Sequence, residues 1–365
     1  MNDPTNKINW YRCKVDRDLM KELMRKSDAK AFAQVIPQLL LYAATATLAY
    51  LLFLNVNAHN WHWALPLLLV GVFIHGTFTS FFGGIAGHEL CHKTPFATPS
   101  LNTFFLKIYS FLSWFDPTAY RASHIRHHQS TVYADYDGEV VLPQGLDWHG
   151  FLFIVRNLTT SPTGFLKNMR YWVGAAFGKV GLDGFFNSKW LNEVLPASNV
   201  EQRREIIRWA RIVVFGHLAL AILFVATGHW FLIVLVTFGA HYSSWFVSLV
   251  GAPQHIGLSP NVPDFRLNTR TFTCGFLPGF CYWNMQYHCD HHMFPAVPFY
   301  NLPRLHAAIK HDLPPAPHGL WETWKVILPI MKRQREEPGY VFVPKLPGND
   351  GDRVGDQLLH AEASQ

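Results

Sequence analysis

The stretch that decides the fold runs from residue 31 to residue 88: AFAQVIPQLLLYAATATLAYLLFLNVNAHNWHWALPLLLVGVFIHGTFTSFFGGIAGH. It contains no Lys, Arg, Asp or Glu. A charge at the centre of a bilayer costs about 2.5–3.5 kcal/mol on insertion scales, and one helical span needs about 20 residues. The stretch therefore predicts two spans, at about 36–56 and 65–87, joined by the polar turn 57–63.

A second charge-free stretch covers residues 212–263 and predicts two more spans, at about 212–227 and 230–251. Buried core helices of a soluble protein are the alternative, but two consecutive charge-free helical hairpins favour a membrane. Lys and Arg gather before residue 31 and between residues 89 and 211, so the positive-inside rule places these segments and the C-terminal segment in the cytoplasm. The expected fold is an all-α integral membrane protein with four transmembrane helices, arranged as two hairpins under a cytoplasmic helical cap.

The composition agrees with a chain that is partly in lipid and partly outside it. Hydrophobic residues make up 49% and charged residues 15%, against about 25% charged in ordinary soluble domains. Mean hydropathy is only +0.06, so a substantial polar part remains. We expect a cytoplasmic amphipathic N-terminal segment at 1–34, which lies on the membrane surface or packs on the body. A membrane domain at 35–343 and a disordered tail at 344–365 complete the expected organisation.

The twenty histidines contain three clusters with helical spacing: HELCH at 88–92, HIRHH at 124–128 and HCDHH at 288–292. Positions i, i+3 and i+4 share one helix face, so each cluster predicts a row of imidazoles pointing one way. One H-x-x-H-H is expected about 0.06 times by chance at this histidine frequency, and the chain has two. A further histidine follows the expected fourth span in GAPQHIG at 251–257. The candidate metal ligands and catalytic residues are His88, His92, His124, His127, His128, His255, His288, His291 and His292.

These nine imidazoles would converge on one layer just outside the bilayer, and they are too many for a single ion. The boxes and the two hairpins that divide them resemble the membrane fatty acid desaturase superfamily over residues 35–310. The resemblance implies two iron(II) ions that use dioxygen to attack an unactivated C–H bond. Acyl-CoA desaturases of that family carry Asn four positions before the extra histidine, where this chain has Gly251. HELCHK and GAPQHIG look more like the alkane hydroxylases, whereas the second box has the desaturase form.

Three functions remain open on the sequence. The first is desaturation of a fatty acyl chain or similar lipid, the second is hydroxylation or ketolation of an alkyl chain, and the remote third is a zinc-binding membrane receptor or transporter. The chain has no nucleotide fingerprint, haem segment or iron–sulfur cysteine run, so a separate ferredoxin, rubredoxin or b-type cytochrome would supply electrons. No nucleic-acid partner is expected. The site would face the cytoplasm, with a bacterial inner membrane favoured over the endoplasmic reticulum.

Residues near the boxes have supporting roles in this interpretation. Metal-bound histidines usually donate their second N–H to a carboxylate or carbonyl, and Asp135 or Asp137 is expected to accept it. His75 and His241 lie inside expected spans, too far from the boxes to ligate, and a structural hydrogen bond is favoured over the bottom of a substrate tunnel. The other histidines are expected at the surface or the membrane interface: His59, His62, His149, His217, His229, His306, His311, His318 and His360.

Overall fold

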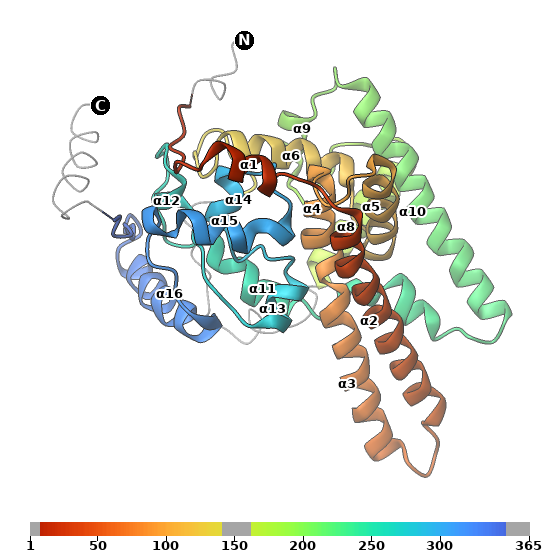
Figure 1. Cartoon of the computed structure of the whole chain (residues 1–365). Coiled ribbons are helices and arrows are strands. Elements are labelled where there is room, and N and C mark those ends of the chain that lie inside the picture. Colours follow the sequence, from red (N-terminus) through yellow and green to blue (C-terminus); the bar gives the residue numbers. More distant parts are fainter. Residues whose placement is uncertain (1–7, 141–161, 348–365) are drawn as a thin grey trace.

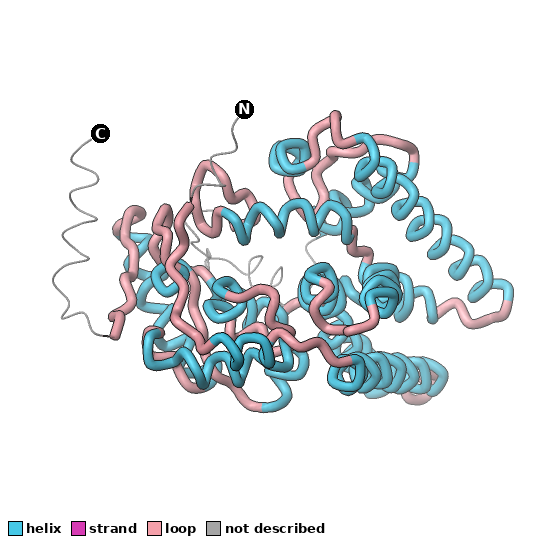
Figure 2. The backbone as a smooth tube through the Cα atoms, turned by 45° about the horizontal axis from the view of Figure 1, so that its top comes forward, coloured by secondary structure: helices cyan, strands magenta, loops and turns pink. Residues whose placement is uncertain are grey.

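The computed structural model describes residues 8–140 and 162–347, and within these ranges the protein is helical, with only isolated β-bridges (Figure 2). Its first half contains α1 Arg17–Leu23, α2 Asp28–Asn55, α3 Trp61–Thr79, η2 Phe82–Gly87, α4 His88–His92, α5 Pro99–Ser113, α6 Pro117–Gln129 and α8 Pro162–Ala176. The second half contains α9 Ser188–Val194, α10 Val200–Ala226, η3 Ile233–Thr237, η4 Gly239–His241, α11 Trp245–Gly251, η5 Ala252–Gln254, α12 Phe265–Asn268, α13 Phe276–Cys281, α14 His288–Met293, η6 Phe299–Asn301, α15 Leu302–Ile309, η7 Lys310–Asp312 and α16 Gly319–Glu336.

Three helical stretches are long and apolar enough to cross a membrane: Asp28–Asn55, Trp61–His92 and Val200–Ala226. The first two form a hairpin that extends from the rest of the molecule, and α10 runs along another side (Figure 1). Their outer faces carry exposed apolar side chains such as Leu40, Leu69 and Ile222, each more than 60% exposed. Such faces suit lipid better than water. The all-helical class is confirmed for the described residues, and three helices that could cross a membrane overlap three of the expected spans.

The fourth expected span, at 230–251, does not form one continuous helix. This stretch contains the π-turn η3, the 3₁₀ turn η4 and the short helix α11. Its backbone passes directly over Gly76 of α3, where an added Cβ would lie 3.1 Å from the backbone nitrogen of Ser243. Ser243 also shares a 2.7 Å hydrogen bond with Thr77. These contacts pack the irregular backbone of this stretch against α3.

The first histidine box follows a π-helical turn, η2, with the sequence FGGIAG at 82–87. Gly87 allows the ring of Phe115 to approach, since a Cβ there would lie 2.7 Å from that ring. Phe115 leads into α6, which begins because the Asp116 carboxylate accepts hydrogen bonds from the first-turn amides of Thr118 and Ala119. The glycines of η2 therefore bring the first and second boxes close together.

The main core joins the N-terminal segment, α4, α5 and α13 to α15. Leu23 of α1 is fully buried in it, so α1 packs on the body of the protein. Tyr11 pairs with Asp264 through a β-bridge and donates a 2.5 Å hydrogen bond to Asp312. Of the expected C-terminal tail, residues 344–347 are not helical, and 348–365 lie outside the described residues.

Candidate metal centre

The three boxes lie on three different helices. Box one forms α4, box two occupies the C-terminal half of α6, and box three forms the start of α14. His255 comes from the turn that follows η5. Thr271 fixes the start of α14, because its hydroxyl accepts from the amide of Cys289 and donates to Asp290. The structure brings all nine candidate histidines together in two neighbouring groups.

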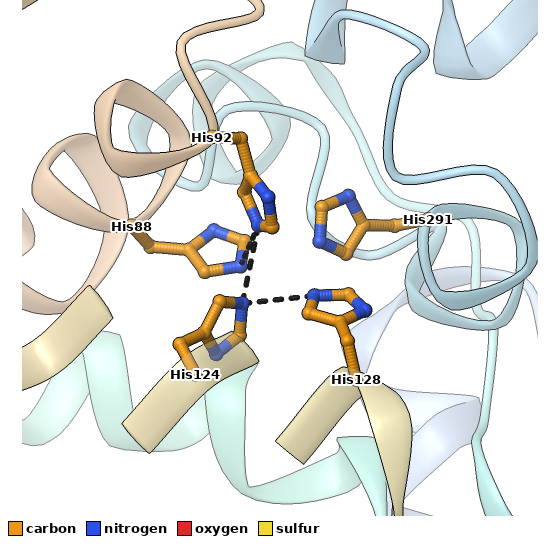
Figure 3. A group of neighbouring side chains, drawn as sticks. All are labelled: His88, His92, His124, His128 and His291. Atoms are coloured by element: carbon orange, nitrogen blue, oxygen red, sulfur yellow. Dashed lines mark hydrogen bonds between the residues drawn. The ribbon is translucent and has the colours of Figure 1, made fainter. Parts of the chain in front are cut away.

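The five-histidine group combines members of all three boxes: His88, His92, His124, His128 and His291. Their rings point toward one another around a common centre (Figure 3). The Nε2 atoms of His88 and His92 are 3.3 Å apart, and those of His92 and His124 are 3.1 Å apart. The Nε2 atoms of His124 and His128 are separated by 2.9 Å. Helices α4 and α6 thus aim the same ring atom at one point, and α14 brings the ring of His291 to within 4.9–5.0 Å of the rings of His88, His92 and His128.

The four-histidine group contains His127, His255, His288 and His292, all of them buried. Nε2 of His288 lies 3.2 Å from Nε2 of His255 and 3.1 Å from Nε2 of His292. The rings of His128 and His292 stack at 4.4 Å between the two groups. The two groups therefore form one continuous histidine cluster.

Hydrogen bonds at the far ring atoms fix the tautomers of two members of this second group, His255 and His292. Nδ1 of His255 lies 2.9 Å from the carbonyl oxygen of Asn268, which can only accept, so Nδ1 carries the proton. Thr131 donates its hydroxyl proton to the carbonyl of His127, so it accepts from Nδ1 of His292 at 3.1 Å. In both residues Nε2 is left with a free lone pair. The Nε2 lone pairs of His255 and His292 therefore both face Nε2 of His288.

Carboxylates on the turn after α6 orient two further ligands. Asp137 accepts from Nδ1 of His127 at 2.8 Å and from the backbone amides of Val132 and Glu139. Glu139 accepts from Nδ1 of His124 at 2.9 Å and from Ser123 at 2.7 Å. Of the two residues expected for this role, Asp137 has it, whereas Asp135 is exposed. Sequence reasoning did not select Glu139, although it stands two residues further in the same acidic turn.

Burial keeps most of these imidazoles neutral, which is the form that binds a metal. It lowers the pKa of His255 to about 3 and, with the neighbouring histidines, holds the pKa of His128, His291 and His292 well below 6.5. His127 differs: burial lowers its pKa, but the charge and hydrogen bond of Asp137 outweigh burial and raise it to about 9. A metal at the four-histidine group must therefore displace a proton from His127.

The donor set fits two transition-metal ions. Imidazole nitrogens about 2.1 Å from one ion lie roughly 3.0–3.4 Å apart at ordinary bond angles, and the Nε2 separations fall close to that range. Glu89 supports a cationic occupant. Both of its oxygens are buried without a hydrogen-bond partner in the described part of the chain, and Oε1 lies 3.2 Å from Nδ1 of His88 and 3.8 Å from Nδ1 of His291. A buried carboxylate without donors is costly unless positive charge lies nearby.

The departure from the desaturase pattern has a structural counterpart. A Cβ at Gly251 would lie 3.8 Å from the hydroxyl of Tyr282, with no nearer atom. That hydroxyl contacts the side-chain amide of Gln254, whose nitrogen lies 3.2 Å from Nδ1 of His288. Gln254 therefore supplies an amide beside the four-histidine group, one residue before His255.

The remaining sequence candidates separate into structural and unassigned residues. His75 makes the expected structural hydrogen bonds, with Thr45 at 3.0 Å and with the carbonyl of Leu235 at 3.0 Å. His217 was expected near the surface, but it is buried and stacks between Phe111 and Trp114. His306 contacts Asp290 at 3.0 Å. His149 and His360 lie outside the described residues.

Two buried arginines near the four-histidine group have protein partners. Arg266 forms ion pairs with Asp264 at 2.8 Å and Asp312 at 2.7 Å. Arg270 donates to the backbone carbonyls of Pro253 and Ile256, which places it under the turn that carries His255. Both side chains therefore support the fold around the second group.

Comparison with known proteins agrees with this geometry. The family model described as fatty acid desaturase matches residues 61–324, a range that contains all nine histidines and both groups. A search of curated proteins finds no significant match. Because the family model covers well over half of the chain, this protein belongs to the fatty acid desaturase family.

Proposed function

We propose that the protein is a dioxygen-dependent di-iron membrane oxidoreductase that desaturates a fatty acyl chain or a similar lipid. The observation that carries the proposal is the convergence of nine buried or half-buried imidazoles in groups of five and four. Structural zinc uses four ligands and commonly recruits cysteine. Cys91 and Cys289 stand inside boxes one and three, yet neither belongs to a group.

The protein residues have defined tasks in this proposal. The nine histidines would hold two irons, which would supply the oxidising chemistry for an unactivated C–H bond. Asp137 and Glu139 would keep His127 and His124 in the tautomer with a free Nε2. Burial would exclude bulk water and would keep the imidazoles neutral. No described residue supplies electrons, so we infer a separate donor protein, in line with the sequence analysis.

Metal content is the first test. Purified protein should contain two irons per chain, and the variant His127→Ala should lose iron from the four-histidine group. The exposed His62 on the α3 end of the hairpin gives a matched control, and His62→Ala should retain both irons. Two zinc ions and no iron would refute the oxygenase proposal and favour the receptor or transporter.

Lipid profiling separates the two reaction classes. Cells that express the wild-type protein should accumulate lipids with new double bonds, and cells that express His127→Ala should not. New hydroxyl or keto groups instead of double bonds would assign the protein to the hydroxylase branch, which Gly251 and GAPQHIG resemble. Identical profiles from both proteins would refute an activity on cellular lipids.

We also propose that the stretch 230–251 completes a second membrane hairpin with α10, and that the histidine groups lie on the cytoplasmic side. The support is the absence of charge over 212–263 and the basic residues just before it, Arg203, Arg204, Arg208 and Arg211. The variant Gly228→Cys places a thiol in the turn between the two arms, and this thiol should react with an impermeant maleimide from the outside of intact cells. Labelling of this variant only after the cells are opened would refute the orientation.

A further inference from the structure

An exposed apolar edge lies where α13 begins beside α16. Its members, called the α13–α16 edge below, are Phe276, Leu277, Trp321 and Leu328. Phe276 is 85% exposed and Trp321 is 71% exposed. A backbone bridge between Thr273 and His318 holds the starts of the two helices side by side. Large apolar side chains gathered at a surface in this way indicate contact with something other than water.

The outer stripe of α16 adds positive charge to this edge. Positions i, i+4, i+7, i+11 and i+14 share one helix face. Counted from the first turn of α16 these positions are all exposed, and they are Trp321, Lys325, Leu328, Lys332 and Arg335. Lys325 lies 5.5 Å from the ring of Trp321 and also pairs with Glu322, which stands beside the stripe. A stripe of apolar and cationic side chains is typical of a helix that lies on an anionic membrane surface.

The opposite face of α16 is packed on the protein, so the edge has a fixed direction. Trp324 and Ile327 belong to a buried cluster that includes Ile256, the residue after His255. The indole N–H of Trp324 donates to the carbonyl of Leu249 at 3.0 Å. The inner face of α16 therefore supports the turn that carries His255, and its outer stripe points away from that turn.

Contacts with α2 set the level of this edge relative to the apolar helices. The side-chain amide of Gln34 donates to the carbonyl of Phe280 in α13 at 2.7 Å, and Trp283 donates to Gln38 at 3.0 Å. Gln34 and Gln38 are one turn apart at the start of the charge-free stretch 31–88. In Figure 1, α13 and α16 lie at the lower edge of the helical body, and the hairpin of α2 and α3 extends downward past that edge. The edge therefore lies level with the first turns of the apolar part of α2, where a bilayer would begin.

We propose that the α13–α16 edge docks on the headgroup region of the bilayer, on the leaflet nearest the start of α2, with anionic phospholipids as its partner. Trp321 enters the boundary between headgroups and acyl chains, where tryptophan is favoured. Lys332 lies at the level of the phosphates and is attracted to them. Because the inner face of α16 packs on Ile256, this one helix connects the membrane surface with the turn of His255. The inference goes beyond the proposed function and holds for any reaction at the histidine groups.

The test measures the position of a fluorescent label in lipid nanodiscs that hold one full-length chain each. Leu328→Cys places a thiol on the edge. Val326→Cys is the matched control, because it replaces another exposed apolar residue of α16 that lies about 160° around the helix axis. Both variants are labelled with a bimane, and the unmodified chain with its five native cysteines gives the background.

Brominated phospholipids quench a label that lies in the bilayer, and iodide quenches one that lies in water. In nanodiscs of phosphatidylcholine and phosphatidylglycerol, the brominated lipids should quench the Leu328 label at least about twofold more than the Val326 label, and iodide should do the reverse. Equal quenching of both labels by the brominated lipids, or stronger quenching of the Leu328 label by iodide, would overturn the proposal. Quenching of the Leu328 label by neither reagent would also overturn it, because protein would then cover the edge.

Two changes separate the apolar and the charged contributions. Trp321→Glu, made in the Leu328→Cys chain, should reduce quenching by brominated lipid by about twofold or more, because a carboxylate is expelled from the boundary region. Trp61→Glu makes the same substitution at an exposed residue at the far end of the hairpin and should leave the quenching unchanged. Nanodiscs of phosphatidylcholine alone should also reduce the quenching of the Leu328 label. Equal effects of the two tryptophan variants would overturn the role of Trp321 in docking, and unchanged quenching without phosphatidylglycerol would overturn the assignment of anionic lipid as the partner.

Discussion

Replacing Asp137 with Asn tests how the four-histidine group is held. The side chain keeps its size, and Oδ1 of Asn can still accept from the amides of Glu139 and Val140, which bond Oδ1 of Asp137. What changes is the contact with His127, whose Nδ1 lies 2.8 Å from the carboxylate. An amide that keeps its oxygen on Glu139 and Val140 presents its NH₂ group to Nδ1 of His127 and to the amide of Val132, so that donors face donors. His127 must move its proton to Nε2, and this removes the lone pair that would bind a metal.

The size of the expected loss in metal affinity follows from these contacts. Loss of a residue that orients a metal ligand typically lowers metal affinity by 10- to 100-fold, or about 1.4–2.7 kcal/mol. The upper part of that range is expected here, because Asp137 is the carboxylate that contacts Nδ1 of His127 and both residues are buried. The five-histidine group contains neither residue and should keep its affinity. Asp137→Asn should therefore lose about one of two metal ions at a chelator concentration that leaves the wild type loaded.

The assay is iron per chain by mass spectrometry after dialysis against graded chelator. Asp135→Asn is the matched control, because it makes the same substitution at an exposed position two residues earlier. The control should lose its iron at the same chelator concentrations as the wild type. If Asp137→Asn retained both irons with an affinity within twofold of the wild type, the tautomer argument would be refuted. An equal loss from both groups would instead show that the turn itself had unfolded.

Three further predictions concern stability, measured as thermal unfolding of the detergent-solubilised protein. Gly87→Val should cost about 1–3 kcal/mol, because its Cβ would lie 2.7 Å from Phe115, whereas Gly84→Val should be near neutral. Arg266→Met should cost about 2–3 kcal/mol by leaving two carboxylates without their partner, whereas Arg304→Met removes an exposed pair and should cost under about 1 kcal/mol. Removal of bound metal by chelation should lower the unfolding temperature by several degrees, and an unchanged value in metal-free protein would contradict the assigned ligands.

Much of the candidate site could be predicted because helical spacing is a local property. Residues at i, i+3 and i+4 share one face of any α-helix, so each box forms a row of imidazoles as soon as its own segment is helical. The segments α4, α6 and α14 are helical. The division into five and four could not be predicted. It depends on how the helices cross, so that His127 and His128, neighbours in the chain, belong to different groups.

Other features depend on contacts between distant segments, which composition does not report. The charge-free stretch 212–263 indicates an apolar environment, but the continuity of its backbone depends on the approach to Gly76 and the hydrogen bond between Thr77 and Ser243. The position of Glu139 depends in the same way on the turn after α6, whose hydrogen bonds bring a residue fifteen positions away back to His124. Both the interrupted backbone and the position of Glu139 arise from tertiary packing, which overrides the local sequence pattern.

Charge balance links the carboxylates to the metals. Two iron(II) ions would bring about four positive charges into a cluster of neutral imidazoles. Glu89, Asp137 and Glu139 lie against that cluster, and Glu89 has no hydrogen-bond donor within the described residues. Asp137 and Glu139 would remain hydrogen-bonded to protein without metal, but Glu89 would remain buried and unpaired. Glu89 is therefore the carboxylate whose burial depends most on an occupied five-histidine group, and Glu89→Gln should raise the stability of the metal-free protein while weakening metal binding there.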